Sequence, residues 1–498
     1  MNRAFQRKYF VDYLFSAGGL FLLILFTGKF FYLKELSLPL SYDESYYWDW
    51  SRHLDWGYYS KPPMVAWLIY LSTKAFGINE FAVRLPALLS ITGAITLLYV
   101  SVFRYFGEYL ARAHLFVLSF VPIFFAYSFV MTIDPPLLFF WALSLYFLIE
   151  YLKRPSYLFG LLTGLSMGFS LLTKQTALML PLLTLFYLFF FERKILKLKT
   201  TFLIFFTAFL LYLPNLYWNF KHGFVLLMHT QEHFKRGIPG LFYYVKFYSS
   251  LFALFGPVFF GYFLWYGFKY LKFLRLLKSG SFEKLQEDEA FKLKVLTLFY
   301  VFSFLPVLPL LILALFKEFN PNWIMPLFLS GYLWVLYFLL QKKQTKLLYV
   351  LNLLITLSLC LLLLFLPRNP GLFGKASGLL FYKFLGWKEL ASMVEKHYTG
   401  ELPILCSHRE IASSLAFYMK AHPEVYVVNL EKRPENQYHL WRKDEELLGR
   451  EVLFVQKGDF EPRHLLNAVK LDAIKMNFWG KEKSYSLWKG MYVKVLER

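Results

Sequence analysis

Long apolar segments alternate with short polar ones along the first three quarters of the chain. The apolar segments are residues 12–33, 84–103, 113–131, 135–152, 157–173, 176–191, 201–218, 248–268, 295–316, 323–340 and 347–366. A helix needs about 20 apolar residues to cross the hydrocarbon core of a bilayer. The pattern therefore predicts a polytopic α-helical membrane protein with about 11 transmembrane helices. No small-residue cleavage site follows the first segment, so we expect a retained helix rather than a signal peptide.

The cationic residues between these segments predict the orientation of the chain. Lys and Arg concentrate in alternate loops, namely "NRAFQRK", "RYFGEYLAR", "KRPS", "ERKILKLK", "KYLKFLRLLKSGSFEKLQEDEAFKLK" and "QKKQTK". Cytoplasmic loops of membrane proteins carry such an excess. We therefore expect a cytoplasmic N-terminus, and an odd number of spans then places the C-terminus on the opposite side. The first loop, residues 34–83, is expected to be extracytoplasmic.

The pattern changes near residue 368. Strand-like and helix-like stretches alternate from there, in "LPILCS", "EIASSLAFYMKAH", "VYVVNL", "EVLFVQ" and "MYVKVLE". We expect a transmembrane region over residues 1–367 and a small soluble α/β domain over residues 368–498, on the extracytoplasmic side.

Composition excludes several classes of protein. The chain has 498 residues, of which 57% are hydrophobic and 17% charged, whereas soluble domains carry about a quarter charged residues. The net charge of +21 is spread over the loops between apolar segments, which is typical of contact with lipid headgroups rather than with nucleic acid. Cys360 and Cys406 lie in different environments, so we expect neither a disulfide nor a metal site from cysteine.

The first loop contains "SYDESYYWDWSRHLDWGYYSKPP" at residues 41–63. Its adjacent acids Asp43 and Glu44 are either solvated loop charges or, among aromatic residues at the membrane interface, a tuned general base or a ligand for a divalent cation. Lys61, before two prolines, is either a snorkelling lysine or a substrate contact.

Further ionisable residues occur in the other loops expected outside. Asp134 opens an apolar segment, where it is either a helix cap or a second carboxylate facing the same side as Asp43; together the two could hold a metal ion. Lys174 lies in a turn so short that it must sit near the membrane, where a cation needs an anionic partner such as phosphate. His229 and His233 have the spacing of metal ligands but no HExxH pattern, so zinc is disfavoured.

The motifs as a set resemble a known family. "DESYYWDWSRHLDWGYYSKPPMVAWLIYLSTKAFGINEFAVRLPALLS", "DPPLLFFWALSLYFL", "GLLTGLSMGFSLLTKQTALMLP", "LPNLYWNFKHGF" and "PNW" follow one another between about residue 40 and residue 330. They resemble the bacterial polyprenyl-phosphate-sugar-dependent glycosyltransferases of the GT-C class, which are grouped with the protein O-mannosyltransferases and the lipid A aminoarabinose transferase (ArnT).

The resemblance implies a GT-C fold and roles for individual residues. Asp43 matches the acid generally assigned as catalytic base, with Glu44 beside it, and Asp134 matches the acid that opens a later helix. Lys174 is expected near the donor phosphate, and Lys61 matches the Lys-Pro-Pro of the aminoarabinose transferase. Lys221 and Arg236 are further candidates for the phosphate, and the substrate cavity is expected to include Tyr59, Arg84, His222 and Trp323.

The function implied is inverting transfer of a sugar from a polyprenyl-phosphate carrier to an extracytoplasmic acceptor, with lipid A or lipopolysaccharide as first choice. Protein hydroxyls or a cell-wall polysaccharide are alternative acceptors, and a lipid or sugar transporter is a second class of function. The expected location is the inner membrane, with the C-terminal domain in the periplasm. No cofactor is assigned beyond a possible divalent metal ion.

Overall fold

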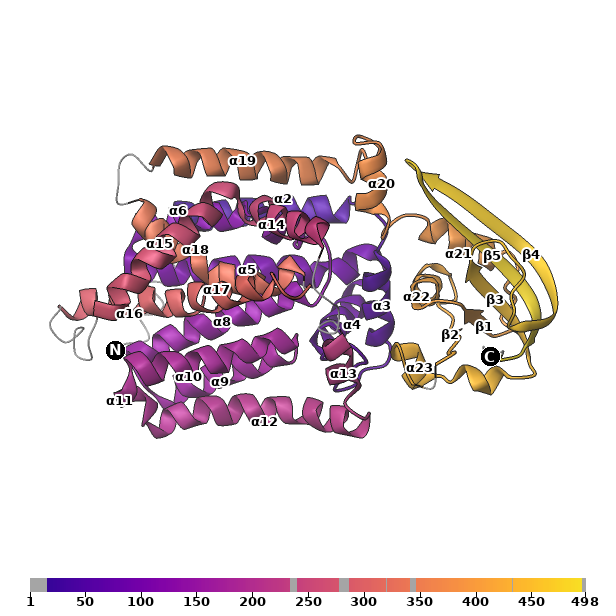
Figure 1. Cartoon of the computed structure of the whole chain (residues 1–498), viewed down its shortest axis with the longest axis horizontal. Helices are drawn as coiled ribbons and strands as arrows, with labels where there is room; N and C mark the ends of the chain where they lie inside the picture. Colours follow the sequence, from indigo (N-terminus) through magenta and orange to yellow (C-terminus); the bar gives the residue numbers. More distant parts are fainter. Residues whose placement is uncertain are drawn as a thin grey trace. The chain divides into compact units, whose positions relative to one another are not determined.

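The computed structural model describes residues 16–232, 240–276, 286–318, 320–340, 346–431 and 433–494. Two compact units make up the chain (Figure 1). The first, here called the helical unit, comprises Met1–Lys34, Arg84–Phe220 and Thr230–Leu363. The second, here called the sheet unit, comprises Glu35–Val83, Lys221–His229 and Leu364–Arg498. The sheet unit therefore unites the first loop with the C-terminal segment, a grouping that the sequence pattern does not indicate.

The helical unit consists of helices that are mostly apolar. Their bounds are α2 Ala17–Lys34, α5 Glu80–Phe106, α6 Glu108–Ser119, α7 Pro122–Ala126, α8 Asp134–Lys153, α9 Tyr157–Leu171, η1 Gln175–Leu178, α10 Met179–Phe191, α11 Arg193–Leu196, α12 Lys199–Lys221, α13 Val225–Glu232, α14 Leu241–Phe255, α15 Pro257–Leu276, α16 Glu287–Val301, α17 Phe304–Leu313, η3 Pro321–Ile324, α18 Met325–Leu339 and α19 Lys346–Phe365. Three of them, α5, α12 and α13, run across a boundary between the two units, as does the end of α19.

The prediction of a multi-span helical membrane protein is confirmed, but the count of 11 spans is not. Among the described residues, seven helices are long and apolar enough to cross a membrane, or eight if α14 and α15 are one span bent by 94°. Gly256, with φ +86°, and Pro257 lie at that bend. The predicted segments 157–173 and 176–191 form shorter helices, and 113–131 breaks into α6 and α7 before Pro122.

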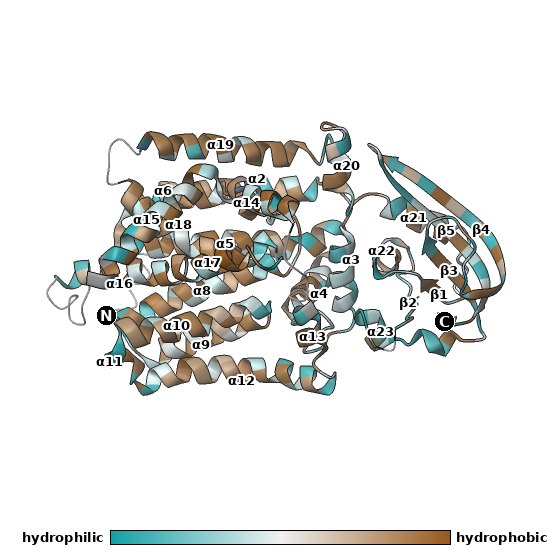
Figure 2. Ribbon diagram, in the orientation of Figure 1, coloured by the Kyte–Doolittle hydropathy of each residue, from teal (hydrophilic) through white to brown (hydrophobic). Residues whose placement is uncertain are grey.

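Burial distinguishes central helices from peripheral ones. The apolar windows of α8 and of the span formed by η3 and α18 are 72% and 78% buried within the protein, whereas those of α2 and α19 are each 17% buried. Figure 2 shows that α19 is hydrophobic along most of its length. Since exposed apolar helix surface requires an apolar environment, α2 and α19 have the surface expected of lipid-facing helices.

Small residues allow one pair of helices to approach closely. Gly160, Gly164 and Gly168 recur every four residues along α9 and face α12. A Cβ atom at Gly164 would lie 2.6 Å from the carbonyl oxygen of Ile204, and one at Gly160 would lie 2.7 Å from that of Thr200. This is the small-xxx-small packing of membrane helices, in which backbones make direct contact.

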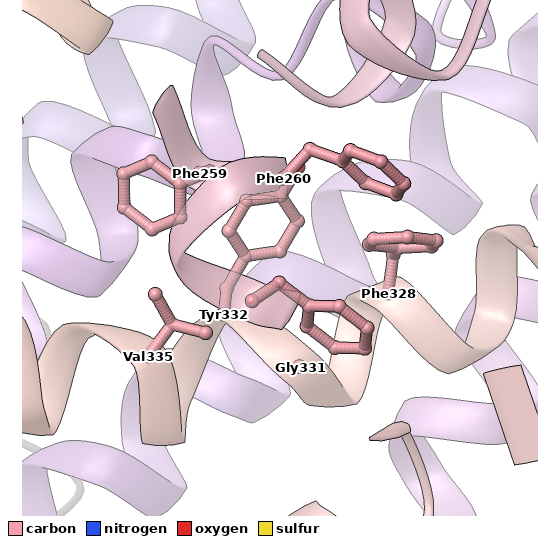
Figure 3. Close-up of a pocket in the computed structure, with 7 residues that line it drawn as sticks. Phe259, Phe260, Phe328, Gly331, Tyr332 and Val335 are labelled. Atoms are coloured by element: carbon pink, nitrogen blue, oxygen red, sulfur yellow. The ribbon is translucent and has the colours of Figure 1, made fainter. Parts of the chain in front are cut away.

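An apolar pocket lies between α15 and α18 in the helical unit (Figure 3). It is lined by Phe259, Phe260, Phe263, Phe328, Gly331, Tyr332 and Val335. Aromatic and aliphatic groups dominate the lining, so the pocket offers no charged group for chemistry.

The sheet unit is built on a five-stranded sheet of order β2-β1-β3-β5-β4. Strand β1 pairs in parallel with β2 and β3, and the β3-β5 and β5-β4 pairs are antiparallel. The elements are α3 Tyr42–Ser51, α4 Met64–Phe76, α20 Lys375–Phe381, α21 Trp387–Glu395, β1 Ile404–Cys406, α22 Arg409–Tyr418, β2 Val425–Val427, α23 Gln437–Trp441, η5 Asp444–Leu447, β3 Glu451–Lys457, β4 Leu465–Phe478 and β5 Lys481–Tyr492. The predicted C-terminal α/β fold is confirmed.

The longest pair of strands was not predicted. The β4-β5 hairpin turns at Trp479 and Gly480, whose φ values are +52° and +87°. Tight hairpin turns need positive φ and usually have Asn-Gly or Asp-Gly there, so Trp-Gly gave no signal. The expected strand "MYVKVLE" is displaced, since β5 already ends at Tyr492.

Candidate active site

Helix α3 places the two acids of the first loop in its first turn. Ser41 is the N-cap: its hydroxyl accepts a hydrogen bond from the Glu44 backbone N–H at 3.3 Å, and the Glu44 carboxylate accepts one from the Ser41 backbone N–H at 2.9 Å. This reciprocal arrangement is a capping box, which satisfies two backbone donors at the start of a helix. Glu44 is fully buried. Its side chain thus defines the start of α3 and the position of Asp43, and its catalytic role stays a prediction.

The Asp43 carboxylate lies between two cations of the C-terminal segment. Arg409 donates to Oδ1 from Nη1 at 3.3 Å and from Nη2 at 3.2 Å, and Lys383 Nζ lies 3.4 Å from Oδ2. The Asp43 side chain remains 29% exposed. Both cations stabilise the negative charge of the carboxylate, which stays partly open to solvent.

Neighbouring groups favour the charged forms of Lys383 and Arg409. Burial acts to lower the pKa of Lys383, but Asp43 and Tyr42 outweigh it and raise that pKa. The pKa of Arg409 is likewise raised, because the fields of Tyr46 and Asp43 outweigh the effect of burial. Burial and the Asp43 charge raise the pKa of the Tyr42 hydroxyl. Both cations therefore stay charged beside Asp43 at neutral pH.

Aromatic rings of α3 hold the two cations in place. The Arg409 guanidinium lies 4.9 Å from the ring centroid of Tyr46, and Lys383 Nζ lies 5.2 Å from that of Tyr42. The Tyr46 hydroxyl accepts a hydrogen bond from the Gln437 backbone N–H at 2.6 Å. Cation–π contacts orient guanidinium and ammonium groups as well as attracting them. The residues around Asp43 therefore form one connected set drawn from α3, the segment between α20 and α21, α22 and α23.

Other ionisable residues of the first loop attach it to the C-terminal segment. Asp49 accepts hydrogen bonds from Arg52 at 3.2 Å and from the Tyr438 hydroxyl at 2.7 Å. His53 Nε2 lies 3.1 Å from Arg442 Nη2. The contacts of Asp49, Arg52 and His53 are those of an internal interface.

Two of the predicted cavity residues also lie in the sheet unit. The Tyr59 backbone N–H donates to Gln437 Oε1 at 2.6 Å, and its ring lies 5.3 Å from that of His229. His222 is half-buried. The phosphate candidates Lys61 and Lys221 are half-buried and exposed, respectively. Arg236 and His233 lie outside the described residues.

A second cluster, within the helical unit, joins three predicted elements. Lys174 Nζ donates to Asp134 Oδ1 at 2.8 Å, and Asn322 Nδ2 donates to Asp134 Oδ2 at 3.0 Å. Asp134 opens α8, Lys174 precedes η1 and Asn322 lies in η3. Trp323, the next residue, is partly buried against the apolar core, and Arg84 on α5 is fully buried. The structure thus pairs Asp134 with Lys174, for which the sequence predicts separate roles.

Lys383, Arg409, Gln437 and Asn322 contact predicted site residues but were not themselves predicted. Arg409 directly precedes "EIASSLAFYM" and Gln437 lies in "NQYHLW", both in the predicted outer domain, but no spacing rule links them to a loop so distant in sequence. Asn322 precedes Trp323, so only the aromatic residue was selected. No group of three or more His, Cys, Asp or Glu side chains that could hold a metal ion occurs among the described residues.

Comparisons with known proteins agree with this architecture. Residues 60–218 match the family described as dolichyl-phosphate-mannose-protein mannosyltransferase. ArnT from Cupriavidus metallidurans has a similar structure, with a TM-score of 0.62 in the apo state and 0.63 when bound to undecaprenyl phosphate. In both cases the identity is 14%, and the similarity covers 95% of this chain and 98% of ArnT. The chain has the ArnT-like GT-C fold.

A second solved protein is also similar in fold. The archaeal oligosaccharyltransferase AglB from Archaeoglobus fulgidus, in complex with an inhibitory peptide and a dolichol-phosphate, has a TM-score of 0.52 at 11% identity. That similarity covers 88% of this chain and 69% of AglB. The GT-C class expected from the sequence motifs is therefore confirmed at the level of fold.

One curated relative shares more sequence with this chain. Lipid A galacturonosyltransferase RgtD from Rhizobium johnstonii is 31% identical over 229 residues. This match covers 45% of the chain and 48% of the relative, so the alignment spans about half the length of that protein.

Proposed function

We propose that the protein is an inverting glycosyltransferase that moves a sugar from a polyprenyl-phosphate carrier to lipid A or another lipopolysaccharide acceptor. The observation that carries the proposal is the partly exposed Asp43 carboxylate, held between Arg409 and Lys383. Support comes from the ArnT-like fold and from the RgtD match, because one ArnT structure contains undecaprenyl phosphate and RgtD is named for transfer to lipid A.

In the proposed reaction Asp43 is the general base. It accepts the proton of the acceptor hydroxyl while the acceptor oxygen attacks the anomeric carbon of the sugar. The bond between that carbon and the phosphate oxygen breaks, and its electron pair leaves with the polyprenyl phosphate. Direct displacement of this kind inverts the anomeric centre.

Cations stabilise the charge that develops on the departing phosphate. We assign this role first to Lys174, with Lys61, Lys221 and Arg236 as further candidates. An ammonium group has three N–H donors, and Asp134 accepts one from Lys174. The donors of Lys174 that Asp134 does not occupy would reach the phosphate.

We also propose the orientation of the chain in the membrane that the sequence predicts. The distribution of Lys and Arg supports a cytoplasmic N-terminus and periplasmic placement of the first loop and of residues 368–498, in the inner membrane. A lipid-linked donor suits that side of the membrane, since its lipid stays in the bilayer while its sugar is at the surface.

We assign no step to a metal ion. Asp43 and Asp134, the two carboxylates considered as ligands, have Arg and Lys side chains as partners. A divalent cation binds to clusters of oxygen ligands, whose net charge is negative or neutral. The cationic partners of both carboxylates do not fit such a site.

The test is transfer by the purified protein from polyprenyl-phosphate-linked sugars to lipid A, followed by mass spectrometry. Polyprenyl-phosphate galacturonic acid is the first donor to try, because the curated relative is a galacturonosyltransferase; aminoarabinose and mannose donors follow. We expect the mass of one sugar to be added to lipid A and D43N to abolish the addition. Protein acceptors form a second arm, favoured by the match to the protein mannosyltransferase family. Failure with every donor and acceptor, and unchanged envelope glycans in a strain lacking the protein, would overturn the proposal.

A further inference from the structure

The C-terminal segment supplies the strongest contact made by the proposed base. Arg409 is the first residue of α22, and both of its terminal nitrogens donate to the same oxygen of Asp43, Oδ1. We propose that Arg409 is a positioning residue of the active site, which holds the Asp43 carboxylate in the orientation from which it accepts the proton. This inference rests on the proposed function, in which Asp43 is the base.

The geometry distinguishes the two oxygens of the carboxylate. Oδ1 is occupied by two N–H donors of Arg409, whereas Oδ2 has a 3.4 Å contact to Lys383, a lysine that is 56% exposed. The Lys383 contact is long, and lysine has a flexible side chain. A substrate hydroxyl therefore displaces this contact more easily than the Arg409 contact. Oδ2 is therefore the oxygen that takes the proton of the acceptor hydroxyl, and Arg409 stays on Oδ1 throughout.

Arg409 is itself held in a fixed orientation. Its guanidinium lies over the rings of Tyr46 and Tyr42, at 4.9 Å and 5.6 Å from their centroids. The neighbouring turn of α22 is joined to α3 by the Ser413 hydroxyl, which donates to the Tyr42 backbone oxygen at 3.2 Å. A planar guanidinium restrained in this way restricts the rotation of the carboxylate that it binds.

A purely structural ion pair is the competing explanation. Helix α3 already packs beside α22 (Figure 1) through Trp48, whose ring lies 5.0 Å from that of Phe417, and Tyr438 binds Asp49 nearby. Partly exposed ion pairs contribute little to stability, and Arg409 is 35% exposed. Loss of Arg409 should therefore reduce turnover and leave stability unchanged.

The experiment compares R409Q, R409K and R409A with the matched control R52Q in the full-length protein. Arg52 also pairs with a carboxylate of α3, Asp49, and lies 5.3 Å from the Trp48 ring, but it does not contact Asp43. We expect kcat of R409Q to fall by about 100-fold, as misplacement of a reacting group does, with KM and the thermal midpoint unchanged. R409K should recover part of the loss, added guanidinium should restore R409A, and R52Q should keep wild-type kcat.

Two outcomes would overturn the inference. One is a kcat of R409Q within about twofold of wild type, and the other is an equal loss in R409Q and R52Q with no rescue of R409A. D43N separates this inference from the proposed function: if D43N still transfers sugar, the proposed base is wrong. If D43N is inactive and R409Q is fully active, only the role of Arg409 is wrong.

Discussion

Lys174 Nζ lies 2.8 Å from Asp134 Oδ1, and the two side chains are 6% and 3% exposed. Taking two charges out of water is costly, and their attraction offsets that cost only while both are present. The pair joins the start of α8 to the turn before η1. Asn322 connects η3 to the same pair through its hydrogen bond to Asp134. Asp134 and Lys174 are therefore already paired with each other before any substrate binds.

The first prediction concerns this buried pair. D134N and K174M should each destabilise the protein by about 3–5 kcal/mol, because each leaves one buried charge without its partner. The double variant should be more stable than the sum of the single effects implies, as coupled residues show in a double-mutant cycle. Thermal unfolding in detergent measures all four proteins. Strictly additive effects would contradict the pairing.

The second prediction separates the capping role of Glu44 from a chemical one. E44A removes the side-chain acceptor at the third position of α3 and should cost about 1 kcal/mol of stability. Gln also serves at that position of a capping box, so E44Q should keep wild-type stability. Unfolding curves of the two variants test the cap. Sugar transfer by E44Q then tests the chemistry, because its loss in a stable protein would give Glu44 a part in the reaction.

The third prediction concerns the contact between α9 and α12. A methyl group at Gly164 meets the Ile204 carbonyl oxygen at 2.6 Å, so G164A should destabilise the protein by about 1–3 kcal/mol through overpacking. Gly28 on α2 is the matched control, because no heavy atom lies within 4 Å of the corresponding position. G28A should leave the thermal midpoint unchanged or raise it, since Ala favours helix over Gly. Equal midpoints for both variants would show that the helices can separate at no cost.

The fourth prediction is a loss of stability in mild acid. Burial and the neighbouring Arg442 lower the pKa of His53 in the folded protein, so the folded state favours the neutral ring. This contribution is fully present above the unfolded pKa of about 6.5 and declines as the pH falls below it. Asp49, Arg52 and Glu424 also face His53, and Glu424, whose pKa Arg442 lowers against the effect of burial, acts in the same direction at lower pH.

The measurement is the thermal midpoint between pH 7.5 and 5.5. H53Q should show a smaller decrease over this range than the wild-type protein, because its side chain does not titrate. A decrease of the same size in both proteins would assign the acid sensitivity to other groups.

The membrane architecture could be predicted because it depends on local patterns. Apolar length and the positions of Lys and Arg are read from neighbouring residues, and they predicted the helical unit and the α/β character of residues 368–498. Two further local signals in the sequence correspond to features of the fold. "SYDE" at residues 41–44 is a capping-box sequence, and Gly256-Pro257 is a dipeptide that interrupts helices; they correspond to the cap of α3 and the bend between α14 and α15.

The contacts of the candidate site could not be predicted in the same way. Asp43 and Arg409 are separated by 366 residues, and nothing in the spacing of either segment indicates that they meet. Asp134 and Lys174 could each be selected as unusual, but their pairing depends on how α8 and α9 pack, which is a tertiary property. Individual side chains can thus be selected from the sequence as candidates, whereas the residues that they contact cannot.

The composition of the sheet unit has a consequence for biosynthesis. Asp49 and its partner Tyr438 are 389 residues apart, and ribosomes add about 5–20 residues per second. The partners of the aromatic face of α3 are therefore synthesised roughly 20–80 s after α3 itself. Until then Trp48 and Trp50, both fully buried in the folded protein, are exposed to water, lipid or chaperones. Correct assembly of this protein thus depends on protecting its first loop until Tyr438 has been made.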